Sequence, residues 1–420
     1  MQNCNSIDKM KKFQIVSLAG LFALAIVSCE KLLPPAPEPG DTIAEPTEGL
    51  TVAQMSHFIE GDELFAKIYT PEEGLGPIFI QNSCEGCHVG DGKGHPFNTE
   101  VRFGKMGANG EFDYMLDEGG PQLQHRSIAN YVPEQLPAGH EVTSERIAPI
   151  VIGMGHIAAI HDNDILDIVA SQAMDVNGYG ISGRVNYVDA KEYFVAEDIH
   201  VQNADGKYIG RFGKKAKEIT LLDQVVFALK QDIGLTSDYD TEDLYNYETA
   251  IGATDAVAEP EVGSNVVDHL VFYMRTLKTP TRRDADAPEV IQGEEIFQQI
   301  GCNTCHVETF TTTMQDIDAI SEKTFHPYTD LLLHDMGDLL DDNYPEGSAE
   351  GKEWRTPPLW GLGLAEDSQG GTGYYLHDGR ATSIEDAINL HAGEAQVVRN
   401  NYIALSDAEK ELLMSFLKSL

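Results

Sequence analysis

The chain has 420 residues, with 29 Lys and Arg against 68 Asp and Glu, so its formal net charge is −39 at pH 7. A protein that binds nucleic acid needs a surplus of basic residues to neutralise phosphates, so this charge argues against nucleic acid as a partner. The hydrophobic fraction of 42% is too high for a disordered acidic chain and is enough for folded cores. The length fits two or three domains.

Residues 1–29 have the features of a lipoprotein signal peptide. Two lysines precede an uncharged, mostly apolar run from Phe13 to Ser28, which is short for a membrane span. The run ends at Cys29, and a small residue before this cysteine resembles the lipobox of bacterial lipoproteins. We therefore predict lipidation of Cys29; the alternative is an ordinary signal peptide with a fortuitous cysteine. The protein would be exported and held on the periplasmic side of the inner or outer membrane, with its lipid as the sole membrane contact.

Four further cysteines form two copies of the pattern C-x-x-C-H, at residues 84–88 and 302–306. This pattern is typical of c-type haem attachment, in which two thiols bond the haem vinyl groups and the histidine binds the iron. A structural zinc site would need four protein ligands, and a thioredoxin-like motif has no need of a histidine in both copies. We therefore predict two covalently bound haem c groups. The attachment residues would be Cys84, Cys87, Cys302 and Cys305, and the proximal iron ligands His88 and His306.

The spacing of the two motifs predicts two haem domains. They lie 218 residues apart (302 − 84), so each motif would serve its own domain. Residues 30–50 are rich in proline and predict an extended tether. The N-terminal haem c domain would span 51–280, with a long Gly-rich and loop-rich insertion, and the C-terminal one 285–420. Two prolines and a charge run between them favour a boundary there.

Helical patterns dominate outside the insertion, so we predict a mostly α fold built from two cytochrome c-like domains. Apolar residues recur with helical spacing over 266–277, and residues 293–300 predict a helix that leads into the second motif. Ser406 and Glu409 form a capping box ahead of a C-terminal helix. We find no internal repeat in the sequence other than the haem motif itself.

Several blocks of sequence resemble the di-haem oxidoreductases, a family also catalogued as thiol oxidoreductases and related to bacterial di-haem cytochrome c peroxidases. They include both motif regions, "NGYGISGRVN" at 177–186 and "YYLHDGRATSIEDAINLHAGEA" at 374–395. The resemblance covers about residues 55–420. It implies an oxidoreductase in which a C-terminal haem passes electrons to an N-terminal haem that reduces peroxide.

The resemblance also implies a second axial ligand for the C-terminal haem. In the related peroxidases a Met follows the H-D-G motif at a fixed distance. Here H-D-G begins at His377, and the equivalent position is His391 (391 − 377 = 14). A His in place of Met would lower the redox potential. Met336 is the alternative ligand, while His377, and with less support His334, would shape the haem surroundings.

For the N-terminal haem, the peroxidases line the open face with a Gln and a Glu ten residues apart. Gln124 and Glu134 have this spacing, so the resemblance implies that Glu134 shuttles a proton and Gln124 orients the oxidant. The alternative for Glu134 is a solvated loop position beside a proline. His95 or His125 could instead bind the resting iron, although each is more often a structural residue.

Calcium is a second cofactor to consider. Asp175 to Gly180 alternates oxygen-bearing side chains with glycine like the first half of a calcium loop, but no bidentate Glu follows. A Gly-rich turn is the competing interpretation, and calcium between the haem domains would match the peroxidases.

Other functions fit the same motifs. The protein could be a non-catalytic electron-transfer cytochrome, a haem oxidase of a protein or organic substrate, or a partner in iron acquisition. The long insertion argues against a bare carrier. The acidic surface suits a small redox donor of the cytochrome or cupredoxin type, and peroxide or another small oxidant would be the acceptor.

Overall fold

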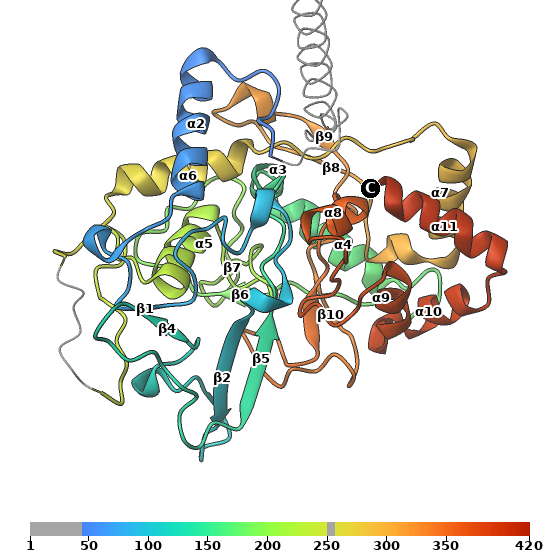
Figure 1. Ribbon diagram of the computed structural model, residues 1–420. Coiled ribbons are helices and arrows are strands. Elements are labelled where there is room, and N and C mark those ends of the chain that lie inside the picture. The colour runs from blue at the N-terminus through green and yellow to red at the C-terminus, as the bar shows by residue number, and fades with distance from the viewer. Residues whose placement is uncertain (1–43, 250–256) are drawn as a thin grey trace, which may run out of the picture. The chain divides into compact units, whose positions relative to one another are not determined.

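Two pairs of crossing helices stand next to the two C-x-x-C-H motifs. The computed structural model describes residues 44–249 and 257–420, so the predicted signal peptide and Cys29 lie outside the described residues. In the first pair, α2 (Val52–Ala66) packs against α6 (Ser264–Thr276). In the second, α7 (Pro288–Ile300) packs against α11 (Asp407–Ser419), as Figure 1 shows at the C-terminal end of the chain.

The helices follow the predicted patterns. α6 and α7 cover the two segments with helical spacing. Ser406 caps α11 through a capping box with Glu409, as predicted. The remaining α-helices are short: α3 (Met154–Ala158), α4 (Asp162–Ala173), α5 (Leu221–Ala228), α8 (Ala365–Ser368), α9 (Ile384–Leu390) and α10 (Gln396–Ile403).

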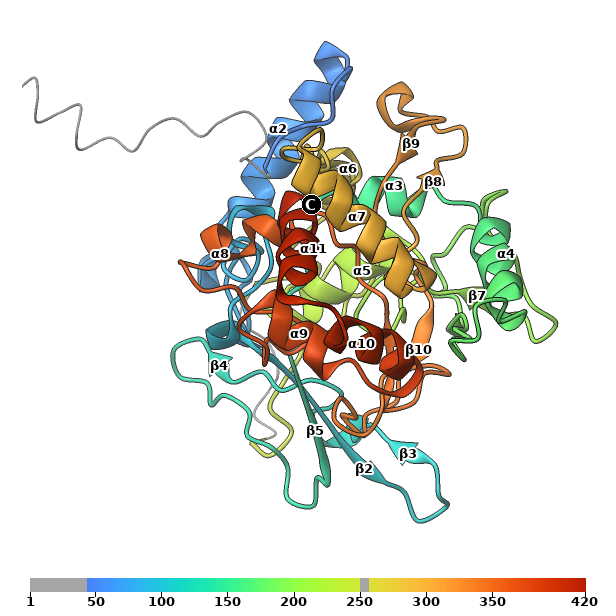
Figure 2. The same ribbon diagram turned by 90° about the vertical axis from the view of Figure 1, so that its right-hand side faces the viewer.

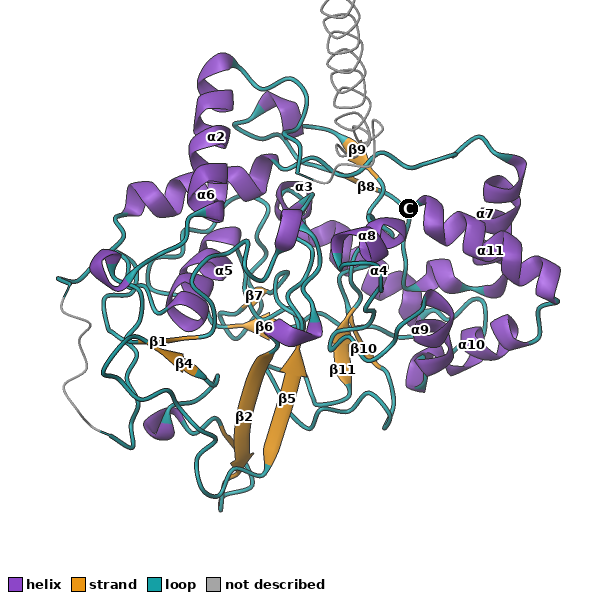
Figure 3. Cartoon of the chain, viewed as in Figure 1, coloured by secondary structure: helices purple, strands orange, loops and turns teal. Residues whose placement is uncertain are grey.

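The prediction of a mostly α fold is wrong. Only 34% of the structure is helical and 12% is strand, and the rest is loop (Figure 3). Glycines with positive φ, such as Gly119, Gly153 and Gly234, turn the chain sharply between the elements. Side chains then bond the loop backbone: Asn186 donates from Nδ2 to the carbonyls of Lys215 and Glu346. In these loops, side chains therefore provide hydrogen-bond partners for backbone carbonyls that no helix or strand pairs.

The strands are short and pair antiparallel. The order β3-β2-β5 makes the longest sheet, and β2 and β5 lie side by side in Figures 1 and 2. The other pairs are β1-β4, β6-β7, β8-β9 and β10-β11. The bounds are β1 (Ile78–Phe79), β2 (Glu100–Met106), β3 (Phe112–Asp113), β4 (Arg126–Ser127), β5 (Val142–Arg146), β6 (Tyr187–Val188), β7 (Tyr208–Ile209), β8 (Phe310–Thr311), β9 (Thr324–Phe325), β10 (Leu333–Asp335) and β11 (Glu353–Arg355).

Each helix pair crosses at a glycine, which reveals a repeat that we did not find in the sequence. A Cβ on Gly61 of α2 would lie 2.5 Å from the His269 carbonyl oxygen of α6, and a Cβ on Gly293 of α7 would lie 2.1 Å from the Leu412 carbonyl oxygen of α11. The segments are "GDELFAKI" at 61–68 and "GEEIFQQI" at 293–300. The repeat therefore extends beyond the haem motif to the helix that precedes it.

The buried apolar residues form two main clusters. One gathers around α2, α5 and α6 and also takes in Phe310, Phe325 and Trp360. The other lies among α7, α9, α10 and α11. The described residues belong to one compact unit, and the predicted division into 51–280 and 285–420 stays a prediction.

The start of the described chain lies along the end of α6. Pro46 pairs with Leu277, and the Thr47 amide donates to the Thr276 carbonyl. The last residues of the predicted tether, 44–50, are thus docked on the fold. Within 44–249 and 257–420, no helix has both the length and the apolar character that a membrane crossing requires.

Candidate functional site

Both C-x-x-C-H motifs form the same tight turn. The amide of His88 donates to the carbonyl of Cys84 at 3.0 Å, and the amide of His306 donates to that of Cys302 at 3.0 Å. The turn brings the histidine near the two cysteines of the same motif. An aromatic ring from the preceding helix lies beside each histidine: Phe65 is 6.0 Å from the His88 ring and Phe297 is 6.2 Å from the His306 ring, between centroids.

One continuous cavity of about 390 Å³ joins the two motifs. All four cysteines and both histidines of the motifs line it, and none of the four thiols is in a disulfide. Burial raises the pKa of Cys84, Cys87 and Cys302 to about 12, so these thiols are neutral at pH 7. Burial also lowers the pKa of His88 and His306 to about 4, so both imidazoles are neutral. Neutral imidazole is the form that binds iron, and the residues present fit two haem groups.

His391 faces the same cavity close to His306. It follows the last turn of α9, which Ser383 caps, and its charge would lower the pKa of His306. The Nδ1 atom of His391 lies 2.7 Å from the Ala387 carbonyl, and that of His306 lies 3.0 Å from the Tyr328 carbonyl. Each ring therefore has Nε2 left to bind a metal. The placement is compatible with the predicted ligand role, which stays a prediction.

The other predicted residues near the second motif also line the cavity. The His334 ring lies between two carboxylates, with Asp330 at 2.8 Å and Glu394 at 2.9 Å, so both of its nitrogens are occupied. Although burial opposes it, Asp330 raises the pKa of His334 well above its usual value. His377 stacks on Trp354 with ring centroids 4.6 Å apart. Met336 borders the cavity as well.

Gln124 and Glu134 meet each other but do not line this cavity. The backbone N–H of Gln124 donates to Oε2 of Glu134 at 3.1 Å, and both side chains are buried. Oε1 of Glu134 is buried without a hydrogen bond. Burial raises the pKa of Glu134 to about 8, so its carboxyl is mostly protonated at pH 7. The two residues form a buried pair that does not line the cavity.

Asp232 is an acid on the cavity wall that sequence reasoning missed. It belongs to the π-helical turn Leu229–Ile233 that continues α5, and π-turns are frequent at functional sites. Burial raises its pKa, and Glu100 raises it further. Gln122 donates to its carboxylate at 2.7 Å. No sequence motif marks this residue, because it faces the cavity only through the irregular turn.

A chain of amides connects the two acids. Nε2 of Gln122 and Nε2 of Gln124 both donate to the Gln231 carbonyl, at 3.0 and 3.1 Å. Nε2 of Gln122 also donates to Asp232, and the backbone N–H of Gln124 donates to Glu134. The N-terminal side therefore holds two carboxyl groups of raised pKa in one hydrogen-bond network.

The alternative ligands for the first motif lie elsewhere. His95 accepts the Phe97 amide at Nδ1 and stacks on the Phe97 ring, and His125 is exposed. Neither lines the cavity. Among the described residues, the histidines on the cavity wall are His88, His306, His334, His377 and His391.

The predicted calcium loop closes on itself. The Gly180 amide donates to Oδ1 of Asp175 at 3.0 Å. The described carboxylates that come within reach of a single ion are instead Asp243, Glu259 and Glu261, where the Thr236 hydroxyl contacts both glutamates. Calcium stays a prediction.

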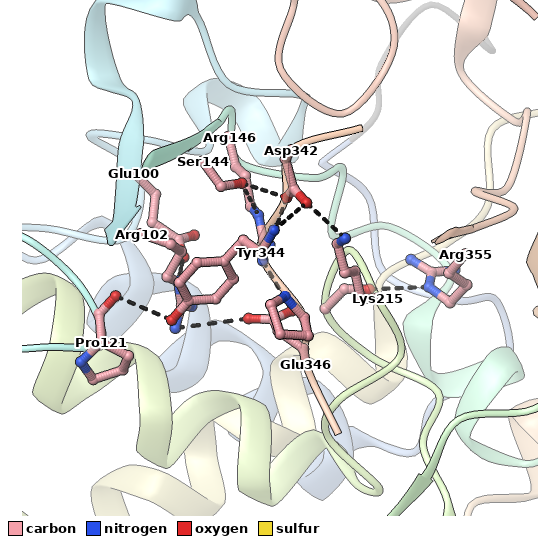
Figure 4. Close-up of polar contacts among 12 residues, drawn as sticks. Glu100, Arg102, Pro121, Ser144, Arg146, Lys215, Asp342, Tyr344, Glu346 and Arg355 are labelled. Atoms are coloured by element: carbon pink, nitrogen blue, oxygen red, sulfur yellow. Dashed lines mark hydrogen bonds and ion pairs between the residues drawn. The ribbon is translucent and has the colours of Figure 1, made fainter. Parts of the chain in front are cut away.

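A buried ion network connects distant segments of the chain (Figure 4). Arg146 of β5 contacts Glu346 at 2.9 Å and Asp342 at 3.2 Å, and Lys215 contacts Asp342 at 2.8 Å. Although burial opposes it, Arg146 lowers the pKa of Glu346 to about 2. Arg102 of β2 is within 4.0 Å of the same glutamate. The network joins β2 and β5 to the loop before β11.

These observations define a protein with two cysteine–histidine sites that face one buried cavity. The family model described as "Di-haem oxidoreductase, putative peroxidase" matches residues 130–420. The chain therefore belongs to the di-haem oxidoreductase family, as the sequence resemblance predicted. Family membership implies haem cofactors and an oxidoreductase. The match includes the second C-x-x-C-H motif and begins after the first.

The remaining comparisons are remote. No curated protein matches the chain. Among solved structures, hydrazine synthase of Kuenenia stuttgartiensis, studied under xenon pressure, is similar with 14% identity and a TM-score of 0.34. The alignment covers 92% of this chain and 97% of that chain.

Proposed function

We propose that the protein is a di-haem c-type cytochrome that reduces hydrogen peroxide to two waters with two electrons and two protons. Cys84, Cys87, Cys302 and Cys305 would form the thioethers. Electrons would enter at the C-terminal haem and pass to the N-terminal haem. The observation that carries this proposal is an asymmetry: a second histidine stands near His306, whereas the described histidines on the cavity wall give His88 no such neighbour.

The C-terminal residues are suited to electron transfer. His306 and His391 each have one nitrogen bonded to a backbone carbonyl, which fixes the tautomer and the ring orientation. Two fixed ligands leave no position for an oxidant, and fixed ligands change little when an electron arrives. His334 keeps a positive charge beside Cys305, 3.8 Å from its sulfur.

The N-terminal residues are suited to proton transfer. Bound haem would supply the redox change of its iron and an open coordination position for peroxide. Cleavage of the O–O bond needs a proton at the departing oxygen. Asp232 faces the cavity and its raised pKa lets it hold that proton near neutral pH. Glu134 accepts the backbone N–H of Gln124 and would be a second acid in the same hydrogen-bond network, which reaches Asp232 through Gln231 and Gln122.

Export and lipid anchoring complete the proposal. We propose that Cys29 carries lipid and that residues 30–43 connect it to the fold on the periplasmic side of a membrane. The net charge of −39 favours a basic small donor of the cytochrome or cupredoxin type. Covalent haem attachment requires the same exported location.

The test is a steady-state assay of the full-length protein with hydrogen peroxide and a reduced small cytochrome c. The variants are Asp232→Asn, Glu134→Gln and, as a matched control, Asp205→Asn in an exposed loop. We expect Asp232→Asn to lose about 10²- to 10⁴-fold in rate, Glu134→Gln to lose less, and Asp205→Asn to match the wild type.

Three outcomes separate the alternatives. Wild-type protein with two haems and no peroxide turnover would contradict the peroxidase and favour an electron-transfer cytochrome. Equal rates for wild type and Asp232→Asn would remove Asp232 as the acid. A larger loss in Glu134→Gln than in Asp232→Asn would assign the proton to Glu134.

A further inference from the structure

Three basic side chains line the cavity between the two motifs without a carboxylate partner. They are Lys93, Lys214 and Arg355, which come from three separate loop and strand segments. Lys214 is 9% exposed and Arg355 is 6% exposed. Their charges act on one another and on His377, which lies on the same wall. We refer to Lys93, Lys214 and Arg355 as the cationic cluster.

The few bonds of the cationic cluster are to neutral groups. Nζ of Lys93 donates to the Leu376 carbonyl at 2.9 Å, and Nε of Arg355 donates to the Gly213 carbonyl at 3.0 Å. The Lys214 ammonium group has no hydrogen bond or ion pair within the described part of the chain. Glu100, Asp330 and Asp378 act on the cluster only at longer range.

The neighbouring buried cations behave differently. Lys215, the next residue after Lys214, bonds the Asp342 carboxylate at 2.8 Å and two backbone carbonyls (Figure 4). Arg146 contacts two carboxylates. This part of the fold therefore pairs its buried charges where they serve structure. The cationic cluster differs from Lys215 and Arg146 in lacking a carboxylate partner, and it faces the cavity.

Unpaired buried charges are unfavourable without a counter-charge. Moving an ammonium group from water into a protein interior costs several kcal/mol unless it is paired. The cost is visible in the cluster, because burial lowers the pKa of Lys93 to about 8 and of Arg355 to about 10. Three like charges also repel one another. An anion in the cavity would remove both penalties.

We propose that the cationic cluster binds the propionate carboxylates of the haem groups, and that Lys214 is its central member. This inference rests on the proposed binding of two haems, which together bring four carboxylates. Charge-assisted hydrogen bonds from Lys and Arg are the usual strong partners of carboxylates. By holding propionates, the cluster would orient the haems and raise their redox potentials, because positive charge nearby favours the reduced iron. A free small carboxylate is the other source of the same chemistry.

The experiment uses the holoprotein and the variants Lys214→Met, Lys214→Arg and Arg355→Met. Lys323→Met, an exposed lysine in the β9 segment, is the control. Haem content per chain is measured first, then the propionate bending bands in the resonance Raman spectrum, then both midpoint potentials by spectroelectrochemical titration. A separate series adds sodium formate to wild type and Lys214→Met.

We expect Lys214→Met and Arg355→Met to shift the propionate bands and to lower at least one midpoint potential. Lys214→Arg should stay close to wild type, and Lys323→Met should be unchanged. If both Met variants bind stoichiometric haem and keep their propionate bands and midpoint potentials unchanged, the inference is wrong. The proposed function is not affected by that result. Formate effects that depend on Lys214, with unchanged propionate bands, would overturn it in favour of a free anion. Wild-type protein without haem would contradict the proposed function, and the inference with it.

Discussion

The two C-x-x-C-H motifs stand beside similar helix pairs, but different groups surround them. Around the C-terminal motif, α7, α9, α10 and α11 form an apolar cluster, and backbone carbonyls orient His306 and His391. Around the N-terminal motif, loops and short strands bring two carboxyl groups of raised pKa into one hydrogen-bond network.

Under the proposed function, this difference would give the two halves separate tasks. If His391 binds the iron together with His306, both axial positions of the C-terminal haem are taken, which suits electron transfer. A site with one histidine and nearby acids can supply protons to an oxidant. Both motifs face the same cavity, and Trp354, His377 and the cationic cluster line its wall. The proposed function would thus combine an electron-transfer site and a reaction site in one chain.

Removing the cysteines of one motif at a time gives the largest expected effect. Cys302→Ser with Cys305→Ser should leave one covalent haem, and Cys84→Ser with Cys87→Ser should leave the other. Intact mass and the pyridine haemochrome of denatured protein measure the result. If either double variant keeps two covalent haems, the assignment of one haem to each motif is wrong.

The spectra of these double variants sharpen the comparison. The variant that keeps the C-terminal haem should show a six-coordinate low-spin iron. The variant that keeps the N-terminal haem should show an iron that binds cyanide or another small ligand readily. Identical ligand binding by both would remove the asymmetry on which the proposed function depends.

Replacing His391 tests the same asymmetry at a single residue. His391→Met should raise the potential of the C-terminal haem, since thioether ligation favours the reduced iron. A near-infrared methionine–iron charge-transfer band should then become visible. The control is His125→Ala, an exposed histidine of the N-terminal half, which should leave both spectra unchanged. A wild-type spectrum that already contains the methionine band would favour Met336 instead.

The sequence was sufficient where a local pattern has one structural meaning. The capping box at Ser406 and the helix predicted over 293–300, which forms the end of α7, follow from spacing and cap residues. The C-x-x-C-H pattern predicted two haem sites, and the structure adds that both motifs line one cavity. These features depend on residues close in sequence, and local patterns determine them.

The rest depends on contacts between distant segments. The fold contains less helix than predicted because long loops are held by side chains such as Asn186, which bonds two remote carbonyls. Asp232 faces the cavity because of a π-turn that no pattern announces. The repeat around Gly61 and Gly293 was present in the sequence, yet its meaning became clear only when both glycines lay against a crossing helix.

The ion network that joins β2 and β5 to the loop before β11 predicts a difference in stability between two variants. Arg146→Met should lower the free energy of unfolding by about 3–5 kcal/mol, because it leaves Glu346 and Asp342 buried without their partner. Lys352→Met removes an exposed pair with Asp338 and should leave the free energy of unfolding close to that of the wild type. Urea denaturation at equal haem content measures both. Similar losses in the two variants would show that the network is not a structural element.

The smallest expected effect is a pH dependence from Glu134. The folded protein keeps its carboxyl protonated up to about pH 8, whereas the unfolded chain ionises it near its ordinary pKa of 4.5. Stability should therefore fall as pH rises between these values, by up to about 1.4 kcal/mol per pH unit, and level off above pH 8. Glu134→Gln should remove this part of the slope, while Glu411→Gln on the exposed side of α11 should keep it. Parallel slopes for wild type and Glu134→Gln would mean that this acid is ionised in the folded protein, which would leave the proton store of the N-terminal half to Asp232.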